Sequence, residues 1–525
     1  MNKTYDLFLK YANNNYKRNL TWLDRDPDSP TYGSFDRNFW HYKTSDFNSD
    51  ILQQGIYTLI ALYKKEIPNN YNKNKLKNLI FSSVKFIILS FKENKKFNEY
   101  YPNEDGYPPH AFLSNVLGDI FFYFPEFLKL PDFENTYIKI NQSLSKRYET
   151  KASNQYATAL AGLYKFVKNF PQHRDMINIE KHKKILLSLQ DKEGWFVEYN
   201  GFDLGYLSIT LEALTEIYKI SLDEDFLNSI NSIIDFYYNI VDKDGNFPFT
   251  LNSRNTEYVL PFGFLNLEKK DKKINYLIDK IFSKEEYFSN LIGNDDRYHS
   301  HYIFANILKS LNLIKDFSTK ENIENTNELY LENAGLYKKH DKENNITLYI
   351  GLKKGGIFRI HNHKNNKILL QNGFRAIKTK KVYTNNFQSK HWNYKLIEKK
   401  IICEGSFVKS QFNKSTPIKH FFLRVLSSLF GNKIIDPLKK LLIFNKKSTK
   451  LKYRREINIE KNRLKIKDSF FGFQNYKIKL NPKQNLRYVA SADIFSDEDL
   501  AENIIDLDET IIKEPTYIIE NYYEL

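Results

Sequence analysis

Apolar residues recur every three to four positions through most of the first 315 residues of the chain. This spacing places them along one face of a helix. It predicts helices that follow one another through short polar connections, near residues 46–65, 75–92, 111–129, 154–168, 203–220, 223–240 and 299–314. A helical layer of this kind closes into an α/α toroid or stacks as an open solenoid, and the pattern alone favours neither.

The spacing of apolar residues changes near residue 325, where alternation begins. Short segments of alternating apolar and polar residues are separated there by Gly, Asn and Lys turns, which is typical of an antiparallel sandwich. The segments begin at Leu348, Gly355, Lys367, Tyr394, Ile401, Arg455, Leu464 and Tyr476. We therefore expect an α+β protein with a helical domain over 1–320 and a β-sandwich domain over 326–525, connected near 318–327.

One apolar segment, at 417–445, interrupts the alternating pattern and has Lys and Arg at its borders. A helix pair packed against either domain explains it, and so does an amphipathic segment that makes peripheral contact with a membrane. No stretch reaches the roughly 20 consecutive apolar residues of a membrane span, and the first residues lack the apolar run of a secretory signal. We expect a cytoplasmic protein with a helical insertion at 417–445.

Composition and charge narrow the choice of partner. The chain has 525 residues, too many for one hydrophobic core, and a net charge of +16 from 79 basic and 63 acidic residues. This charge suits nucleic acid, an anionic membrane surface or an acidic polysaccharide. No zinc finger, phosphate loop or base-reading basic helix is present, so we do not expect a nucleic-acid partner. The single cysteine, Cys403, excludes an internal disulfide and a cysteine-cluster metal site.

Clusters of aromatic, acidic and amide residues lie in the helical part, at the points where successive helices are expected to begin. Such residues are poor material for helix–helix contacts, and loops at the mouth of a helical barrel are where a sugar-binding cleft would need them. The clusters are Gly33–Lys43, Ser153–Tyr156, Glu198–Tyr206, Ser253–Thr256 and Asp295–Tyr298. We interpret them as parts of one site.

With these clusters and the segment Tyr101-Pro-Asn-Glu104, the sequence resembles the heparinase II/III-like group of polysaccharide lyases. The resemblance covers most of the first 315 residues and is to members without a signal peptide, associated with bacterial surface-polysaccharide loci. It implies an α/α toroid followed by a β-sandwich with the substrate between them. It also implies β-elimination on an acidic, uronate-containing glycan, without a cofactor.

A β-eliminating lyase must neutralise the uronate carboxylate, remove the C5 proton and protonate the departing O4. The resemblance places Asn154 and Gln155 at the carboxylate and Tyr206 as the acid. Gln155 stands where many relatives carry a His base, and glutamine cannot take a proton at neutral pH. His301 and His361 are therefore candidate bases, and Tyr206 is a candidate for both proton transfers. The expected sugar-binding residues are Asp36, Arg37, Trp40, Tyr42, Lys43, Glu104, Tyr156, Glu198, Tyr199, Asp203, Arg254, Asn255 and Arg297.

Two other classes of function stay open. Asp36, Asp46, Glu198 and Asp203 would supply the separated carboxylate pair of an inverting glycoside hydrolase, unless each caps a helix or pairs with a cation. The missing His also suits a non-catalytic glycan-binding or assembly protein.

Two histidines one residue apart, His361 and His363, would share one face of a strand. Such a pair suits zinc, but the sequence shows no third ligand nearby. We predict no metal site.

Overall fold

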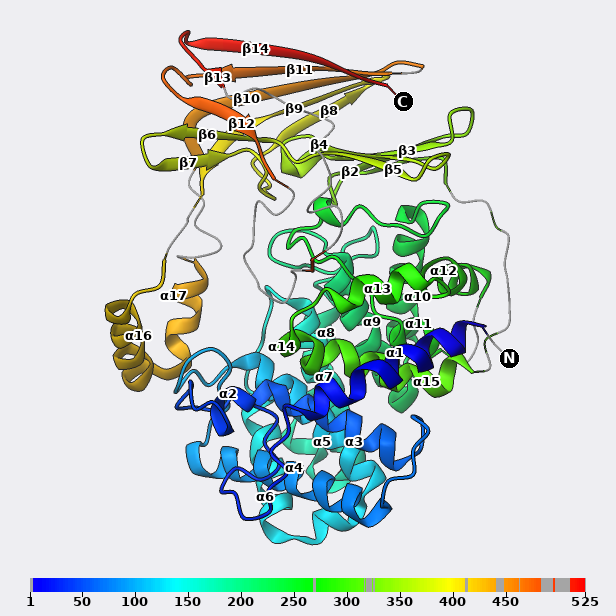
Figure 1. The fold of residues 1–525 in the computed structure, drawn as a ribbon, viewed down its shortest axis with the longest axis vertical. Coiled ribbons are helices and arrows are strands. Elements are labelled where there is room, and N and C mark those ends of the chain that lie inside the picture. The colour runs from blue at the N-terminus through cyan, green and yellow to red at the C-terminus, as the bar shows by residue number, and fades with distance from the viewer. Residues whose placement is uncertain are drawn as a thin grey trace.

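The computed structural model describes residues 3–267, 271–315, 317, 323, 326–410, 414–440, 448–461, 463–482, 494–495 and 510–524. Helices occupy the described residues up to Ile314, and strands begin at Glu328. In Figure 1 the sheets lie above the helical layer, and residues 417–440 of the insertion lie beside that layer. The connection predicted near 318–327 falls mostly outside the described residues.

The longer helices of the N-terminal part form an incomplete ring. They are α1 (Lys3–Leu20), α3 (Ile56–Tyr63), α4 (Lys73–Asn94), α5 (Tyr107–Tyr123), α6 (Pro131–Leu144), α7 (Ser153–Asn169), α8 (Ile179–Leu187), α9 (Leu204–Ser221), α10 (Glu224–Ile240), α12 (Lys272–Phe282), α13 (Glu285–Ile292) and α15 (Phe304–Ile314). Short helices α2 (Arg37–Trp40), α11 (Phe262–Leu265) and α14 (Asp296–Tyr298), the 3-10 turn η1 (Asp50–Gly55) and the π turn η5 (His299–Ile303) lie between them. Helix α15 packs against α1 and α3, which brings the two ends of the helical part together as in a toroid.

Two antiparallel sheets form the C-terminal part. The first has the order β1-β2-β3-β4-β5, and the second has the order β13-β12-β6-β7-β9-β10-β11-β14, with β8 paired to β9. The strands are β1 (Glu328–Leu331), β2 (Leu336–Asp341), β3 (Ile346–Gly351), β4 (Ile357–Asn362), β5 (Lys367–Gln371), β6 (Phe374–Lys378), β7 (Lys381–Thr384), β8 (Asn393–Ile397), β9 (Lys400–Lys409), β10 (Ser448–Ile459), β11 (Arg463–Phe471), β12 (Lys477–Leu480), β13 (Thr510–Ile511) and β14 (Thr516–Glu524).

A shared apolar core joins the two sheets. Ile350 and Phe358 from the first sheet pack in one buried cluster with Ile401, Ile457 and Ile466 from the second. Alternate residues of each strand face this cluster, as the period of two requires. The predicted fold class, an α/α toroid followed by an antiparallel β-sandwich, is therefore observed.

The first sheet rests on the loops that follow α10. The buried Lys354 ammonium donates to the carbonyl oxygens of Thr250 and Asn252 at 2.8 and 2.6 Å, and the Tyr349 hydroxyl donates to the carbonyl of Ile240 at 2.8 Å. These contacts fix the sandwich on the same side of the ring as the loops that carry the candidate site.

The insertion is helical, with α16 (Pro417–Phe430), η7 (Gly431–Ile434) and α17 (Ile435–Lys439). It projects from the second sheet and packs on the helical part. Lys439 pairs with Glu149 at 2.9 Å, and Asp436 pairs with Lys151 at 2.8 Å. None of the helices in the described part of the chain is both long and apolar enough to span a bilayer.

Candidate active site

A cavity of about 640 Å³ lies where the interhelix loops meet the helical insertion. This volume is within the range of roughly 300–1,000 Å³ found for small-ligand sites. The residues predicted from sequence that line it are Asn154, Gln155, Tyr206, His301, Glu104, Tyr199 and Arg254. With Tyr298, which also lines it, the cavity brings together members of four separate polar clusters and the Tyr101–Glu104 segment.

The start of α7 is positioned by a strand-like bridge between two loops. Ala152 pairs with Glu198, and the Ser153 hydroxyl donates to the carbonyl of Val197 at 2.7 Å. One carboxylate oxygen of Glu198 then accepts from the main-chain and side-chain nitrogens of Asn154, at 2.9 and 2.5 Å. Because the Asn154 amide carries two hydrogens, one remains for a ligand in the cavity.

Glu198 also holds Arg254. The guanidinium Nη1 donates to the second carboxylate oxygen at 3.1 Å, and both side chains are buried. Burial raises the pKa of Glu198 to about 7, against the attraction of Arg254. Within the described residues, Arg254 Nε is a buried donor without a hydrogen-bond partner, and Gln155 Oε1 is a buried acceptor without one.

Tyr206 lies in the first turn of α9, which Asp203 caps. One oxygen of Asp203 accepts the main-chain amide of Tyr206 at 3.2 Å, and the other accepts the amide of Arg254 at 3.1 Å. A side chain at Gly205 would collide with Thr256, so this glycine permits the close approach of the two loops.

A cation lies directly over the Tyr206 ring. The Arg254 guanidinium carbon is 3.8 Å from the centroid of Tyr206 and 4.3 Å from that of Tyr199. Burial opposes the charge on Arg254, but Tyr206 and its other neighbours outweigh burial and raise the arginine pKa. A permanent cation at this distance is the kind of neighbour that favours the charged form of a tyrosine, whereas burial of Tyr206 opposes it.

His301 lies on the π turn η5 and is held in one tautomer. The Gln54 amide nitrogen donates to the carbonyl of Ile51 at 3.2 Å, which fixes the orientation of the amide, and it lies 2.6 Å from His301 Nδ1. Nδ1 is therefore an acceptor and the ring proton is on Nε2. Burial, together with Arg297, holds the pKa of His301 well below its usual range. The neutral ring is thus arranged to donate a hydrogen bond rather than to accept a proton at Nδ1.

Sequence reasoning missed several cations and tyrosines of the cavity. Arg147 and Tyr148 line it from the loop before α7, and Lys439 lines it from α17. Extending the Asn154 cluster backward along its own loop would have found the first two. The contribution of Lys439 had no such signal, since it comes from the insertion, nearly three hundred positions later in the sequence.

The first polar cluster lies outside the cavity, which corrects the prediction for Asp36, Arg37, Trp40, Tyr42 and Lys43. The contacts that these side chains make are instead with nearby residues of the helical part. The Asp36 carboxylate accepts the amides of Asn38, capping α2, and of Ser49. The Trp40 indole donates to a main-chain carbonyl at 2.7 Å, and Arg37 stacks on Tyr42.

Three further predicted residues also support the site from outside rather than line it. The Tyr156 hydroxyl bonds to His182 Nδ1 at 2.9 Å, and Asn255 Oδ1 accepts from Lys354 at 2.6 Å. Arg297 donates to the carbonyl of Glu99 at 3.0 Å and lies 4.9 Å from the ring of Tyr100, which lines the cavity.

The four carboxylates considered for hydrolysis do not line the cavity either. Asp36 and Asp203 cap helices, and Glu198 holds Asn154 and Arg254. Asp46 pairs with Arg424 of the insertion. Each of these carboxylates therefore caps a helix or pairs with a cation, which is the alternative to hydrolysis that the sequence analysis left open.

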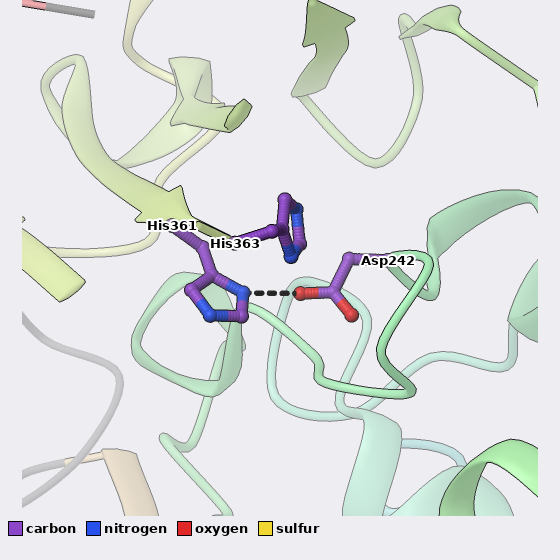
Figure 2. A group of neighbouring side chains, drawn as sticks. All are labelled: Asp242, His361 and His363. Atoms are coloured by element: carbon purple, nitrogen blue, oxygen red, sulfur yellow. Dashed lines mark hydrogen bonds and ion pairs between the residues drawn. The ribbon is translucent and has the colours of Figure 1, made fainter. Parts of the chain in front are cut away.

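His361 does not reach the cavity, which corrects its assignment as a candidate base. It lies on β4 and its Nδ1 is 2.7 Å from Asp242 Oδ2, on the loop after α10 (Figure 2). Its Nε2 is 3.0 Å from Asn366 Oδ1. Both ring nitrogens thus have polar partners, and the Asp242 carboxylate favours the protonated ring, so His361 bridges the helical part and the first sheet.

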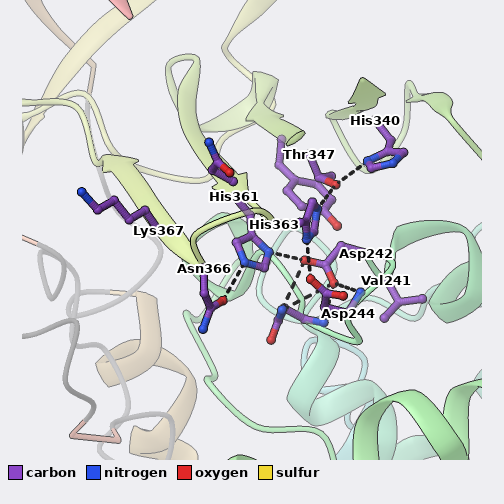
Figure 3. A network of polar contacts seen from close by, with 12 residues as sticks. Val241, Asp242, Asp244, His340, Thr347, His361, His363, Asn366 and Lys367 are labelled. Carbon is purple, nitrogen blue, oxygen red and sulfur yellow. Dashed lines mark hydrogen bonds and ion pairs between the residues drawn. The ribbon is translucent and has the colours of Figure 1, made fainter. Parts of the chain in front are cut away.

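Asp242, His361 and His363 form a compact group whose ligand atoms lie within 4.8 Å of one another. This donor set could hold a divalent metal, and Asp242 is the third ligand that the sequence did not reveal. In the network of Figure 3, however, His363 already bonds to Asp244 at 2.6 Å and to Thr347 at 2.7 Å. We interpret the group as an ion-pair network between the two domains.

The Asp242–His361 pair predicts a pH-dependent stability. Burial opposes both charges, but the hydrogen bond and the attraction between the two groups, together with bonds from neighbouring residues, outweigh burial, raising the pKa of His361 and lowering that of Asp242. The histidine contribution is therefore full below its unfolded pKa of about 6.5 and is lost as pH rises through the folded value. The aspartate contribution is lost only as pH falls below about 3.9. His361→Gln should thus lower the free energy of unfolding more at about pH 5.5 than at about pH 8.5, measured by urea unfolding.

The neighbouring charges Asp244, His363 and Arg359 are unchanged in this variant, so the comparison isolates His361. Dialysis against a chelator should leave the thermal midpoint of the native protein unchanged. A metal found by elemental analysis, with a lower midpoint after chelation, would show that the group is a metal site instead.

The described residues form an α/α toroid followed by an antiparallel β-sandwich, a fold that is also found in solved polysaccharide lyases. The structure is similar to that of the Streptomyces coelicolor A3 chondroitin AC lyase in complex with chondroitin sulphate, with a TM-score of 0.55 and 9% identity, over 90% of this chain and 67% of that chain. A tyrosine-to-alanine mutant of the same lyase aligns with a TM-score of 0.51 and 8% identity over the same shares. No family model matches the sequence, and no curated protein matches it.

Proposed function

We propose that this protein is a heparinase II/III-like lyase that cleaves an acidic, uronate-containing bacterial glycan by β-elimination. The observation that carries the proposal is the convergence of Asn154, Tyr206 and Arg254 on one cavity, with the guanidinium over the phenol ring. An acidic substrate is further supported by the similar lyase, whose structure contains chondroitin sulphate. Under the same proposal, the protein acts in the cytoplasm on a bacterial surface polysaccharide.

The uronate carboxylate would be neutralised by donors that the cavity leaves available. These are the second hydrogen of the Asn154 amide, the amide nitrogen of Gln155 and the guanidinium of Arg254, all on side chains that line the cavity. Neutralising the carboxylate acidifies the C5 proton, since the charge that develops on the carbanion spreads onto it. Gln155 can therefore help to neutralise the carboxylate, although it cannot replace a histidine base.

Tyr206 would carry both proton transfers. As a phenolate beside Arg254, its oxygen takes the C5 proton, the C5–H electrons form the C4–C5 double bond, and the C4–O4 bond breaks. The same hydroxyl then returns the proton to O4 of the leaving sugar. His301 would contribute its Nε2 hydrogen as a neutral donor rather than act as the base.

The lyase and hydrolase hypotheses give different products. We expect purified protein, incubated with a panel of uronate-containing glycans over a range of pH, to release an unsaturated product that absorbs in the ultraviolet. New reducing ends without that absorbance would indicate a hydrolase. Binding of a glycan without turnover at any pH would indicate a non-catalytic protein, and either result would overturn the proposal.

A further inference from the structure

Helix α16 of the insertion exposes its apolar face. Seven of its large apolar side chains are 39–70% exposed, namely Ile418, Phe421, Phe422, Val425, Leu426, Leu429 and Phe430. Their spacing of three and four residues places most of them on one stripe. On the other side, Ser427 is buried and Leu423 lines the cavity. A helix of a soluble domain normally turns its apolar stripe toward the core, and α16 does the reverse.

The orientation of α16 is fixed by polar contacts with the ring. The Arg424 guanidinium forms a two-pronged ion pair with Asp46, and the Asn432 amide donates to Asp105 at 2.8 Å. The helix begins with a Thr416 cap and Pro417 in its first turn, which favour a defined start. The exposed stripe is therefore held away from the ring, and Figure 1 shows α16 at the side of the helical layer.

The segment that carries this face is basic. Residues 414–440 contain one acidic residue, Asp436, which is paired with Lys151. They contain six cationic residues, namely Lys414, Lys419, Arg424, Lys433, Lys439 and Lys440. Arg424 and Lys439 pair with the ring, while Lys414, Lys419, Lys433 and Lys440 are exposed.

We propose that α16 docks this protein on an anionic membrane surface. The apolar stripe would enter the boundary between headgroups and acyl chains, and the exposed lysines would lie against lipid phosphates. A second copy of the chain fits this face less well, because a two-fold contact would bring the same lysines together from both subunits. The inference is independent of the proposed lyase activity.

The test is flotation of the full-length protein with vesicles of phosphatidylcholine alone or mixed with phosphatidylglycerol. We expect binding to the mixed vesicles that weakens at about 0.5 M salt, since screening reduces attraction to the lipid phosphates. The variant Phe421→Ser/Phe422→Ser/Leu429→Ser should lose at least about tenfold in vesicle affinity. Lys419→Glu/Lys433→Glu should lose only the preference for anionic lipid.

The matched control is Phe122→Ser/Ile292→Ser, which removes two exposed apolar side chains from other helices of the ring. It should bind vesicles as the native protein does. Absence of binding to anionic vesicles would overturn the proposal. So would a concentration-dependent dimer, seen by sedimentation, that the triple variant abolishes. Turnover of a soluble glycan should be unchanged in the triple variant. The proposal of membrane docking and the proposal of lyase activity are therefore tested independently.

Discussion

Tyr206→Phe is expected to lower kcat on an acidic glycan by about 10²- to 10⁴-fold, the usual contribution of a positioned acid or base. The hydroxyl is the group that would take the C5 proton and return it to O4, and the ring without it still stacks against Arg254. KM should change little, because the amide and guanidinium donors for the carboxylate remain. Initial rates of ultraviolet absorbance at several substrate concentrations separate the two parameters.

Tyr148→Phe is the matched control for this prediction. Tyr148 also lines the cavity, but its ring stacks on His182, whereas the Arg254 guanidinium lies over the rings of Tyr199 and Tyr206. Its hydroxyl should therefore be dispensable for proton transfer. Native kcat in Tyr206→Phe, or an equal loss in both variants, would remove Tyr206 from the mechanism.

Arg254→Met is expected to lower the free energy of unfolding by about 3–5 kcal/mol, the usual result of breaking one side of a buried ion pair. The change leaves Glu198 buried without its cation. The loss should grow as pH rises, because Glu198, whose pKa burial has already raised to about 7, must then take up a proton or stay charged and unpaired. Urea unfolding at several pH values measures this.

The double variant Arg254→Met/Glu198→Gln distinguishes stability from catalysis. Removing both charges should recover much of the lost stability, since no unpaired charge remains. It should not recover turnover, because the cation over Tyr206 is still missing. Equal stability of the single and double variants would mean that the Glu198–Arg254 pair is not coupled in the native protein.

Periodicity predicted the architecture well because it reports burial directly. Every predicted helical segment contains a helix, and the alternating segments from Leu348 onward correspond to strands of the two sheets. Closure of the ring was not visible in the pattern, since it depends on α15 packing against α1, two elements at opposite ends of the helical part. Closure of the ring was expected only because the sequence resembles polysaccharide lyases.

Sequence analysis identified cavity-lining residues in those loops whose own local structure orients the side chain. Asn154 and Tyr206 lie in the first turns of α7 and α9, where Glu198 accepts the main-chain amide of Asn154 and Asp203 accepts that of Tyr206. The Asp36–Lys43 cluster has similar residue types, but its side chains satisfy groups within their own loop, and a sequence motif does not show which way a side chain points. His361 was misplaced because its partner, Asp242, lies 119 residues away along the chain.

The insertion that exposes α16 also supplies one wall of the cavity, through Leu423, Ile435 and Lys439. Anchoring by α16 would therefore set the cavity at a fixed height above the lipid headgroups. Catalysis would then follow the density of glycan carriers in the bilayer rather than their bulk concentration. Polymer free in solution would compete poorly with chains tethered at that height.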